Sequence, residues 1–155
     1  MNAALRNLLS TAILVLLGAC SSGKHVRSTD LQHSFQWQTL AVTIENAREQ
    51  SKTETTVVAL TAHWGGVTSS YFDRAIQDPA VLKFLAHRSV EGFIADCTFT
   101  NSPGWRAVLE HGEQAAPVSF AIWKRGRQLE FVRPEITPQG ITPKAVIAAI
   151  APYTR

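Results

Sequence analysis

The segment that most constrains the fold of this chain is residues 55–62, TTVVALTA. Its β-branched residues favour an extended strand, and its apolar residues do not alternate with polar ones, so both faces are expected to be buried. Such a strand is typical of a parallel sheet with helices on both faces. The following residues, 63–67 (HWGGV), predict a turn, and a helix is predicted over 70–76 with Thr68 or Ser69 as its N-cap. The segment therefore predicts a strand-turn-helix unit of an α/β protein.

Helical and extended patterns alternate along the rest of the chain. The other predicted elements are a helix near 40–52, a helical segment over 80–87 after a break at Asp78-Pro79, a strand over 90–95, a helix from about 101 to 111, a hairpin of strands over 118–124 and 129–133, and a helix over 143–150. Because β-α-β units precede a hairpin and a last helix, we expect one mixed sheet of about four strands with helices on both faces.

The composition indicates a single folded domain. The chain has 155 residues, 45% of them hydrophobic and 17% charged, and can bury a core without disulfide or metal staples. Its two cysteines, Cys20 and Cys97, exclude a disulfide-rich scaffold and a zinc site of four sulfur ligands. The five histidines show no metal-ligand spacing, so neither a metal site nor a cofactor is expected. With 15 basic and 12 acidic side chains and no basic run, nucleic acid is not an expected partner.

The first residues have the pattern of a targeting segment. After Arg6, residues 8–17 form an apolar run that is too short to span a bilayer, which needs about 20 residues, and is typical of a signal-peptide core. The next motif, Leu17-Gly18-Ala19-Cys20, resembles the lipobox of bacterial lipoproteins. The resemblance implies that residues 1–19 are a lipoprotein signal peptide and that Cys20 is acylated and anchors the protein to a membrane. The alternative is an ordinary secretory cleavage site that includes a cysteine.

The residues after Cys20 imply where the anchor lies. Ser21 stands where an Asp would mark inner-membrane retention in the bacterial sorting pattern, so the resemblance implies the outer membrane, facing the periplasm. Residues 20–34 are polar and have no hydrophobic period, which predicts a tether. The folded domain is therefore expected to span residues 35–155.

Three short motifs in the domain carry a resemblance to a known family. They are Ala62-His63-Trp64 at the end of a strand, Asp78-Pro79-Ala80-Val81 at the helix break, and Ala116-Pro117 before the hairpin. With these motifs, residues 35–150 resemble the thioredoxin superfamily, most closely the C-terminal thioredoxin-like domain of the thiol:disulfide interchange protein DsbD family. The resemblance implies a thioredoxin-like fold.

The chain departs from this family at the residues that carry the redox chemistry. In the family, the tryptophan is followed by Cys-x-x-Cys at a helix N-terminus, which lowers the pKa of the nucleophilic thiol. Here Trp64 is followed by Gly65, Gly66, Val67 and Thr68, so glycine and threonine occupy the two cysteine positions. A buried acid of the family is replaced by Ala59. Since thiol-disulfide exchange requires an attacking thiolate, no catalytic residue is expected in this loop, and the domain is expected to be a pseudoenzyme.

Three features of the domain leave alternatives open. Cys97 follows a predicted strand and is either a small buried residue or a thiol that supports residual redox chemistry on its own. The family resemblance implies that the Ala116-Pro117 bond is cis and borders a peptide groove near Trp64, which favours an envelope protein or peptide as partner. Alternatively, Pro117 only begins a strand. A third function is small-anion binding by the loop at 65–70, since it precedes a helix N-terminus, although the sequence favours simple capping as the role of that loop.

Overall fold

The computed structural model describes residues 34–41, 43–125 and 129–155. The predicted signal peptide, Cys20 and the tether up to His33 therefore lie outside the described residues, as does most of the predicted turn between the hairpin strands. In the part of the chain that is described, no helix combines the length and the apolar composition needed to cross a membrane.

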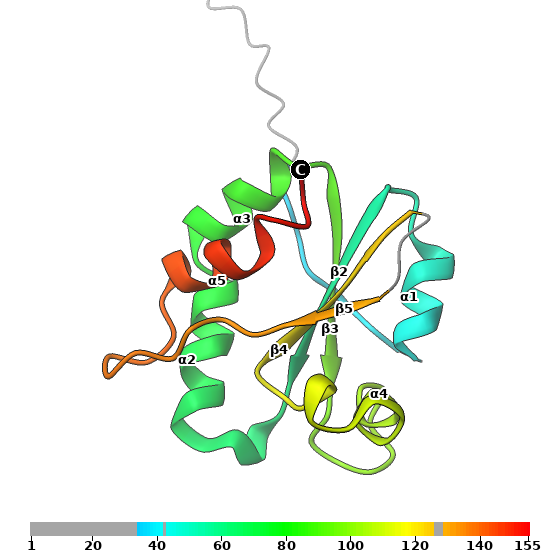
Figure 1. Cartoon of the computed structure of the whole chain (residues 1–155), viewed down its shortest axis with the longest axis vertical. Helices are drawn as coiled ribbons and strands as arrows, with labels where there is room; N and C mark the ends of the chain where they lie inside the picture. Colours follow the sequence, from blue (N-terminus) through cyan, green and yellow to red (C-terminus); the bar gives the residue numbers. More distant parts are fainter. Residues whose placement is uncertain (1–33, 42, 126–128) are drawn as a thin grey trace, which may run out of the picture. The chain divides into compact units, whose positions relative to one another are not determined.

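One sheet of five strands forms the centre of the domain (Figure 1). The strands are β1 (Gln38–Thr39), β2 (Thr55–Thr61), β3 (Val90–Asp96), β4 (Ser119–Lys124) and β5 (Glu130–Val132), and their order is β1-β3-β2-β4-β5. The first three strands in this order are parallel, while β4 pairs antiparallel with both β2 and β5. The sequence predicted about four strands and missed β1, because a strand of two residues leaves no recognisable pattern. The order and directions of the strands confirm the predicted thioredoxin-like fold.

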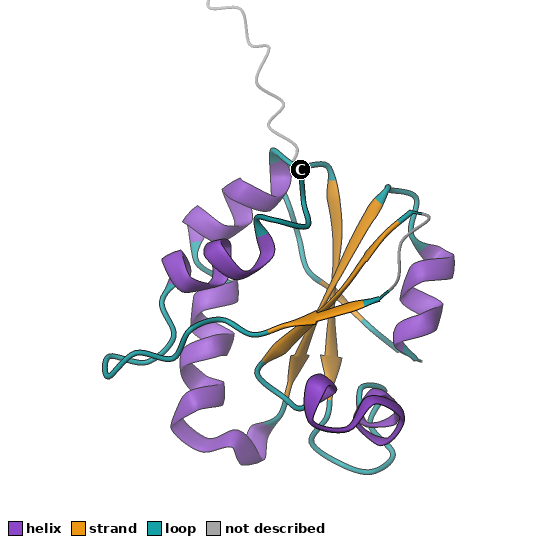
Figure 2. Ribbon diagram, viewed as in Figure 1, coloured by secondary structure: helices purple, strands orange, loops and turns teal. Residues whose placement is uncertain are grey.

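Helices cover both faces of this sheet (Figures 1 and 2). They are α1 (Ile44–Gln50), α2 (Gly66–Ile76), α3 (Pro79–Ala86), α4 (Trp105–His111) and α5 (Pro143–Ile150), with short 3-10 turns η1 (His63–Gly65) and η2 (Gly112–Ala115). Residues of α2, α3 and α5 contribute to the core on one face, and residues of α1 and α4 to the core on the other. The predicted break in the second helix is confirmed, since Asp78 Oδ1 accepts a hydrogen bond from the Ala80 N–H at 2.8 Å and caps α3.

Three predicted helix starts were wrong. Helix α2 begins at Gly66, so Gly65 is its N-cap, and Thr68 and Ser69 lie inside the first turn. Helix α4 begins at Trp105, two residues after the expected Pro103. The first helix begins at Ile44 and not near Leu40, because Leu40 donates its N–H to the Ile94 carbonyl at 2.8 Å and extends the pairing of β1.

The packing of β2 explains why its sequence is apolar throughout. All seven of its residues are buried. Val57 and Ala59 pack on the side of α2, α3 and α5, while Val58 and Leu60 pack on the opposite side. Since successive side chains of a strand point to opposite faces, a central strand between two cores has no solvent-facing position.

Candidate peptide-binding rim

The carboxyl ends of β2 and β3 meet at one edge of the sheet, where the turn η1 and the loop after β3 lie side by side. The Cys97 N–H donates to the Thr61 carbonyl at 2.7 Å, and the His63 N–H donates to Thr98 Oγ1 at 3.1 Å. Trp64 crosses from one segment to the other, since its Nε1 donates to the Cys97 carbonyl at 3.2 Å. We call this edge, with residues 63–68, 96–99 and 116–118, the rim.

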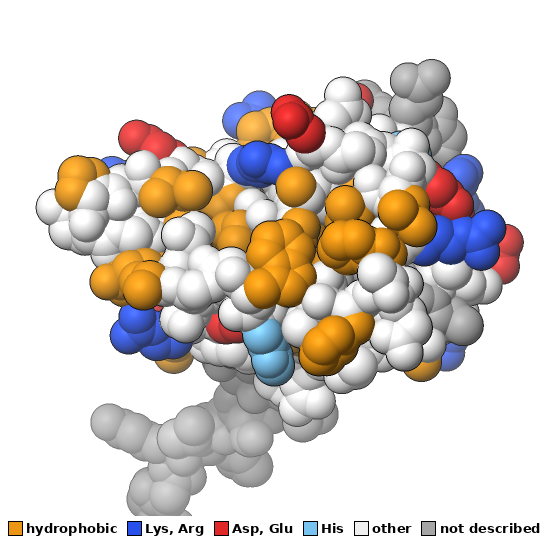
Figure 3. Space-filling view, turned by 90° about the horizontal axis from the view of Figure 1, so that it is seen from below, with side chains coloured by type: hydrophobic (Ala, Val, Ile, Leu, Met, Phe, Trp, Pro, Cys, Tyr) orange, Lys and Arg blue, Asp and Glu red, His pale blue; other side chains and the backbone are white. Residues whose placement is uncertain are grey.

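Large apolar side chains are exposed on the rim. The exposed fractions are 57% for Trp64, 68% for Val67 and 66% for Phe99. Hydrophobic side chains also gather on the face of the molecule that includes the rim (Figure 3). Phe99 was not among the residues predicted for the site, and the only signal for it was an aromatic residue in an otherwise polar loop. The rim therefore offers a contact surface for apolar groups.

Gly65 and Thr68, the two positions singled out in the sequence, both lie at the start of α2. Gly65 is the N-cap of the helix, and Thr68 lies in its first turn. A Cβ atom on residue 65 would lie 1.9 Å from Ser69 Oγ, so the Ser69 hydroxyl occupies the space that a side chain there needs. That hydroxyl is buried and has no hydrogen-bond partner among the described residues. Any side chain at position 65 would therefore have to displace Ser69.

The loop at 65–70 offers few groups to an anion. Ser69 Oγ is buried, and Ser70 Oγ donates to the Gly66 carbonyl at 3.3 Å within the helix. Of the three consecutive hydroxyls, only that of Thr68 is left to supplement the backbone N–H groups of the first turn. The geometry thus gives the predicted anion site little beyond an ordinary helix N-terminus.

The backbone beside Pro117 lies at the same edge, because β4 runs antiparallel to β2 and begins there. The Val118 N–H donates to the Leu60 carbonyl at 3.0 Å, and Ser119 Oγ donates to the Ala116 carbonyl at 2.8 Å. Val118 has a φ of 65°, a left-handed conformation that a β-branched residue adopts only at a cost of about 1–3 kcal/mol. The structure thus places Ala116 and Pro117 at the edge of the sheet where Trp64 lies, while the cis form of the Ala116-Pro117 bond stays a prediction.

Asp96 fixes the loop that carries Phe99. Its carboxylate accepts hydrogen bonds from the N–H and the hydroxyl of Thr98 and from the hydroxyl of Ser102. Burial by itself would raise the pKa of this carboxyl. The hydrogen bonds from Thr98 and Ser102, together with the nearby His63, outweigh burial and hold the pKa of Asp96 below its ordinary value. Asp96 is therefore ionised near neutral pH, and its oxygens serve to order the loop.

Cys97 contributes its backbone to the rim, but its sulfur lies in the core. The residue is fully buried, and a Cβ atom on Gly104 would lie only 2.5 Å from Cys97 Sγ, so the loop backbone closes over the thiol. Burial of the thiol is the larger cause, and the negative charge of Asp96 the smaller one, of a rise in the pKa of Cys97 to about 12. The thiol is thus both covered and protonated near neutral pH.

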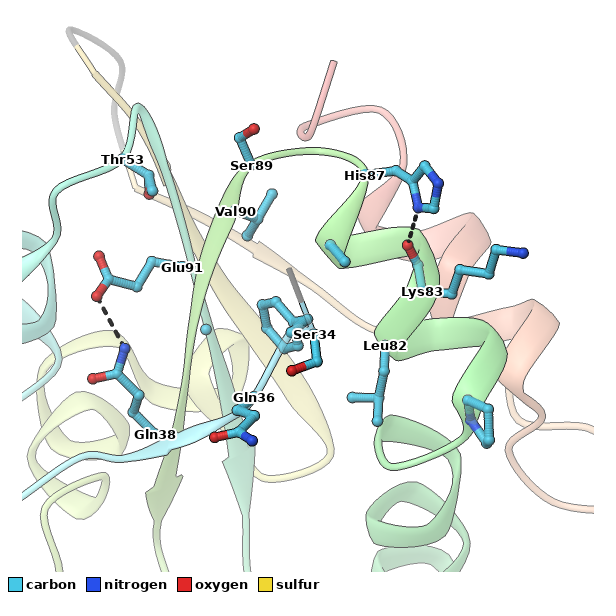
Figure 4. Close-up of a pocket in the computed structure, with 14 residues that line it drawn as sticks. Ser34, Gln36, Gln38, Thr53, Leu82, Lys83, His87, Ser89, Val90 and Glu91 are labelled. Carbon is cyan, nitrogen blue, oxygen red and sulfur yellow. Dashed lines mark hydrogen bonds between the residues drawn. The ribbon is translucent and has the colours of Figure 1, made fainter. Parts of the chain in front are cut away.

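A pocket of about 1020 Å³ lies at the opposite end of the sheet, beside the start of β3 (Figure 4). Its polar groups are already paired: Glu91 accepts hydrogen bonds from Gln38 Nε2 at 3.0 Å and from the Lys52 N–H at 2.9 Å. His87 Nδ1 lies 2.7 Å from the Lys83 carbonyl. The pocket also adjoins Ser34, the first described residue. Since its carboxylate and its imidazole are engaged in these contacts, whereas the rim exposes large apolar side chains, we place the candidate site at the rim.

Comparison with known proteins finds similar chains among the solved structures. No family model and no curated protein matches the sequence. The thioredoxin Mala s 13 of Malassezia sympodialis, a member of a new pan-allergen family, is 18% identical, with 78% of this chain and 93% of its own covered and a TM-score of 0.47. Trxlp of Edwardsiella tarda EIB202 is 13% identical, with 70% and 92% covered and a TM-score of 0.42. The assignment of a thioredoxin-like fold therefore rests on the order and directions of the five strands.

Proposed function

We propose that this protein is a periplasmic lipoprotein of the outer membrane whose thioredoxin-like domain binds a protein or peptide at the rim and does not catalyse thiol-disulfide exchange. One observation carries the proposal: Trp64, Val67 and Phe99 are each more than half exposed at the edge where thioredoxin-like proteins hold their thiols. Large exposed apolar patches on a protein surface mark interaction sites.

The surroundings of the rim support binding over redox chemistry. Gly65 and Thr68 supply no sulfur, and Ser69 fills the space beside Gly65. Cys97 is the remaining thiol of the domain, and it is fully buried with a raised pKa. Residual redox chemistry through Cys97 would need the loop that covers it to open, so it is the weaker of the two functions.

The same surroundings suit an extended apolar segment as the partner. Trp64 presents a flat, rigid ring whose Nε1–H already donates a hydrogen bond to the Cys97 carbonyl. The loop that carries Phe99 is held by hydrogen bonds to the Asp96 carboxylate. Aromatic side chains held in this way lose little conformational entropy when they contact a ligand. We infer that apolar side chains of the partner pack on Trp64 and Phe99.

The binding proposal is tested with a library of labelled peptides, in which the sequences range from alternating apolar and polar residues to polar residues alone. Binding to the full chain is measured by fluorescence anisotropy. We expect the apolar peptides to bind the full chain, and Trp64→Ala to weaken binding at least about tenfold, as loss of an interface anchor typically does. Ile136→Ala is the matched control, because this side chain is 63% exposed but is not part of the rim. If all peptides bind equally weakly, or if both variants weaken binding alike, the rim is not the binding surface.

The anchor part of the proposal rests on Cys20 and the lipobox-like residues before it. Several acyl chains on one residue give stable membrane attachment, whereas a single chain gives marginal attachment. In bacteria grown with labelled palmitate, the wild-type chain is expected to carry label and to sediment with outer membranes. Cys20→Ser is expected to carry none and to be released in soluble form. Label that persists in Cys20→Ser would contradict acylation at this residue.

A further inference from the structure

Three side chains with metal-ligating atoms converge between α1 and α4. Glu45 lies in the first turn of α1, and Glu110 and His111 are the last two residues of α4. One ligand atom from each of these residues lies within 4.8 Å of those of the other two. Around a shared zinc ion, atoms bonded at about 2.0–2.1 Å in tetrahedral geometry lie about 3.4 Å apart. Small rotations of exposed side chains are therefore sufficient to bring the three atoms to bonding distance.

The surroundings leave room for an ion and orient one of its ligands. A cavity of about 550 Å³ is lined by all three residues, by Glu49, a further carboxylate on α1, and by the basic side chain of Arg48 on the same helix. The imidazole of His111 packs against the ring of Phe131, with centroids 4.9 Å apart. This contact restricts the orientations of His111, which lowers the entropy that the side chain would lose on binding a metal.

Two arginines lie beside the cluster, and only Arg106 is paired with one of its carboxylates among the described residues, in a contact that an ion can displace. Arg106 Nε lies 2.8 Å from Glu110 Oε1, and both side chains are solvent-exposed. Exposed ion pairs of this kind contribute only about 0–1 kcal/mol. Glu110 also has a second carboxylate oxygen that could bind an ion while Arg106 stays in place.

We propose that Glu45, Glu110 and His111 form a binding site for a divalent transition metal, with zinc as the fitting class of ion. One imidazole nitrogen with two carboxylate oxygens is a ligand set that zinc accepts, and water fills the fourth position. Magnesium and calcium prefer oxygen ligands throughout, so the imidazole disfavours them. The site lies outside the rim and is independent of the peptide-binding proposal. It also links two helices that are far apart in the sequence, so the bound ion would stabilise the folded state.

The proposal is tested by isothermal titration with zinc chloride. The full chain is purified without a histidine tag, and bound metal is removed with EDTA. We expect one saturable site that His111→Ala and Glu45→Gln each weaken at least about tenfold, because even indirect partners of a metal site cost that much. His87→Ala is the matched control, since His87 is an exposed histidine at the C-cap of α3 and is not part of the cluster. This variant is expected to bind zinc like the wild type.

Glu45→Gln removes a ligand while His111 still packs on Phe131, so it separates loss of a ligand from loss of that packing, which His111→Ala combines. Thermal unfolding gives a second readout: zinc is expected to raise the melting temperature of the wild type and of His87→Ala, but not of the two ligand variants. The proposal is wrong if the wild type shows no saturable binding. It is equally wrong if both ligand variants bind zinc as tightly as the wild type, because the ion then binds elsewhere on the chain.

Discussion

In the folded protein, Cys97 is expected to react with a thiol-specific label about a thousandfold more slowly than an exposed cysteine at neutral pH. Its pKa rises from the ordinary value of 9.0 to about 12. Since the thiolate is the reactive form, an increase of about three units lowers the reactive fraction about a thousandfold. The cover provided by the backbone at Gly104 slows the reaction further. The measurement is the labelling rate of the Cys20→Ser chain, first folded and then in denaturant.

A matched control is an exposed thiol on the same rim. Phe99→Cys, introduced together with Cys20→Ser and Cys97→Ser, replaces a side chain that is 66% exposed and is expected to label at the rate of a free thiol. If Cys97 in the folded protein instead labels as fast as this control, the thiol is accessible. Residual redox chemistry would then be the better function for the domain.

The same pKa shift has a consequence for stability at alkaline pH. Below about pH 9 the thiol is protonated in both states, so it gives no pH dependence. Between about pH 9 and 12 the unfolded chain loses the proton while the folded chain keeps it, and the free energy of unfolding falls by about 1.4 kcal/mol per pH unit. This slope is expected to be absent in Cys97→Ala, which provides a second measurement of the buried thiol.

The central part of the fold was predictable because its residues carry local signals. The unbroken apolar run of β2 indicates burial on both faces of the strand. The Asp78-Pro79 pair indicates both the end of one helix and the N-cap of the next. The first strand carried no such signal. Gln38 and Thr39 are polar and exposed, and they form a strand only because β3 offers them a parallel edge. Leu40 has helical spacing relative to Ile44, yet its burial comes from that edge.

The candidate sites divide in the same way. The place of Gly65 and Thr68 at the start of a helix could be predicted, because they follow Trp64 and the end of a strand at fixed spacing. The predicted start of α2 was wrong because serine and threonine are usual N-cap residues. Here Gly65 takes the N-cap position, and the Ser69 side chain lies against it. The grouping of Glu45 with His111 could not be predicted, because no spacing along the sequence encodes how two separate helices meet.

Two substitutions, Phe120→Ala in the core and Phe99→Ala on the rim, are expected to separate the stability of the domain from its peptide binding. Phe120 on β4 is fully buried, and its ring lies 5.0 Å from that of Phe72 on α2, between centroids. Phe120→Ala removes the contact between sheet and helix and leaves a cavity, so the free energy of unfolding is expected to fall by about 3–5 kcal/mol. Phe99→Ala removes the same atoms from an exposed position and is expected to change it by about 0.5 kcal/mol or less.

The two variants are compared by urea unfolding and by the peptide-binding assay, both on the full chain. Phe99→Ala is expected to unfold like the wild type and to bind apolar peptides at least about tenfold more weakly, because the lost contact belongs to the rim and not to the core. Phe120→Leu substitutes for Phe120→Ala if the latter does not fold, and it is expected to be destabilised while binding remains intact, because the rim side chains are unchanged. A large loss of stability in Phe99→Ala would mean that Phe99 belongs to the core, and unchanged binding would mean that its exposure serves no partner. Either result would remove the main support for a binding function at this edge of the sheet.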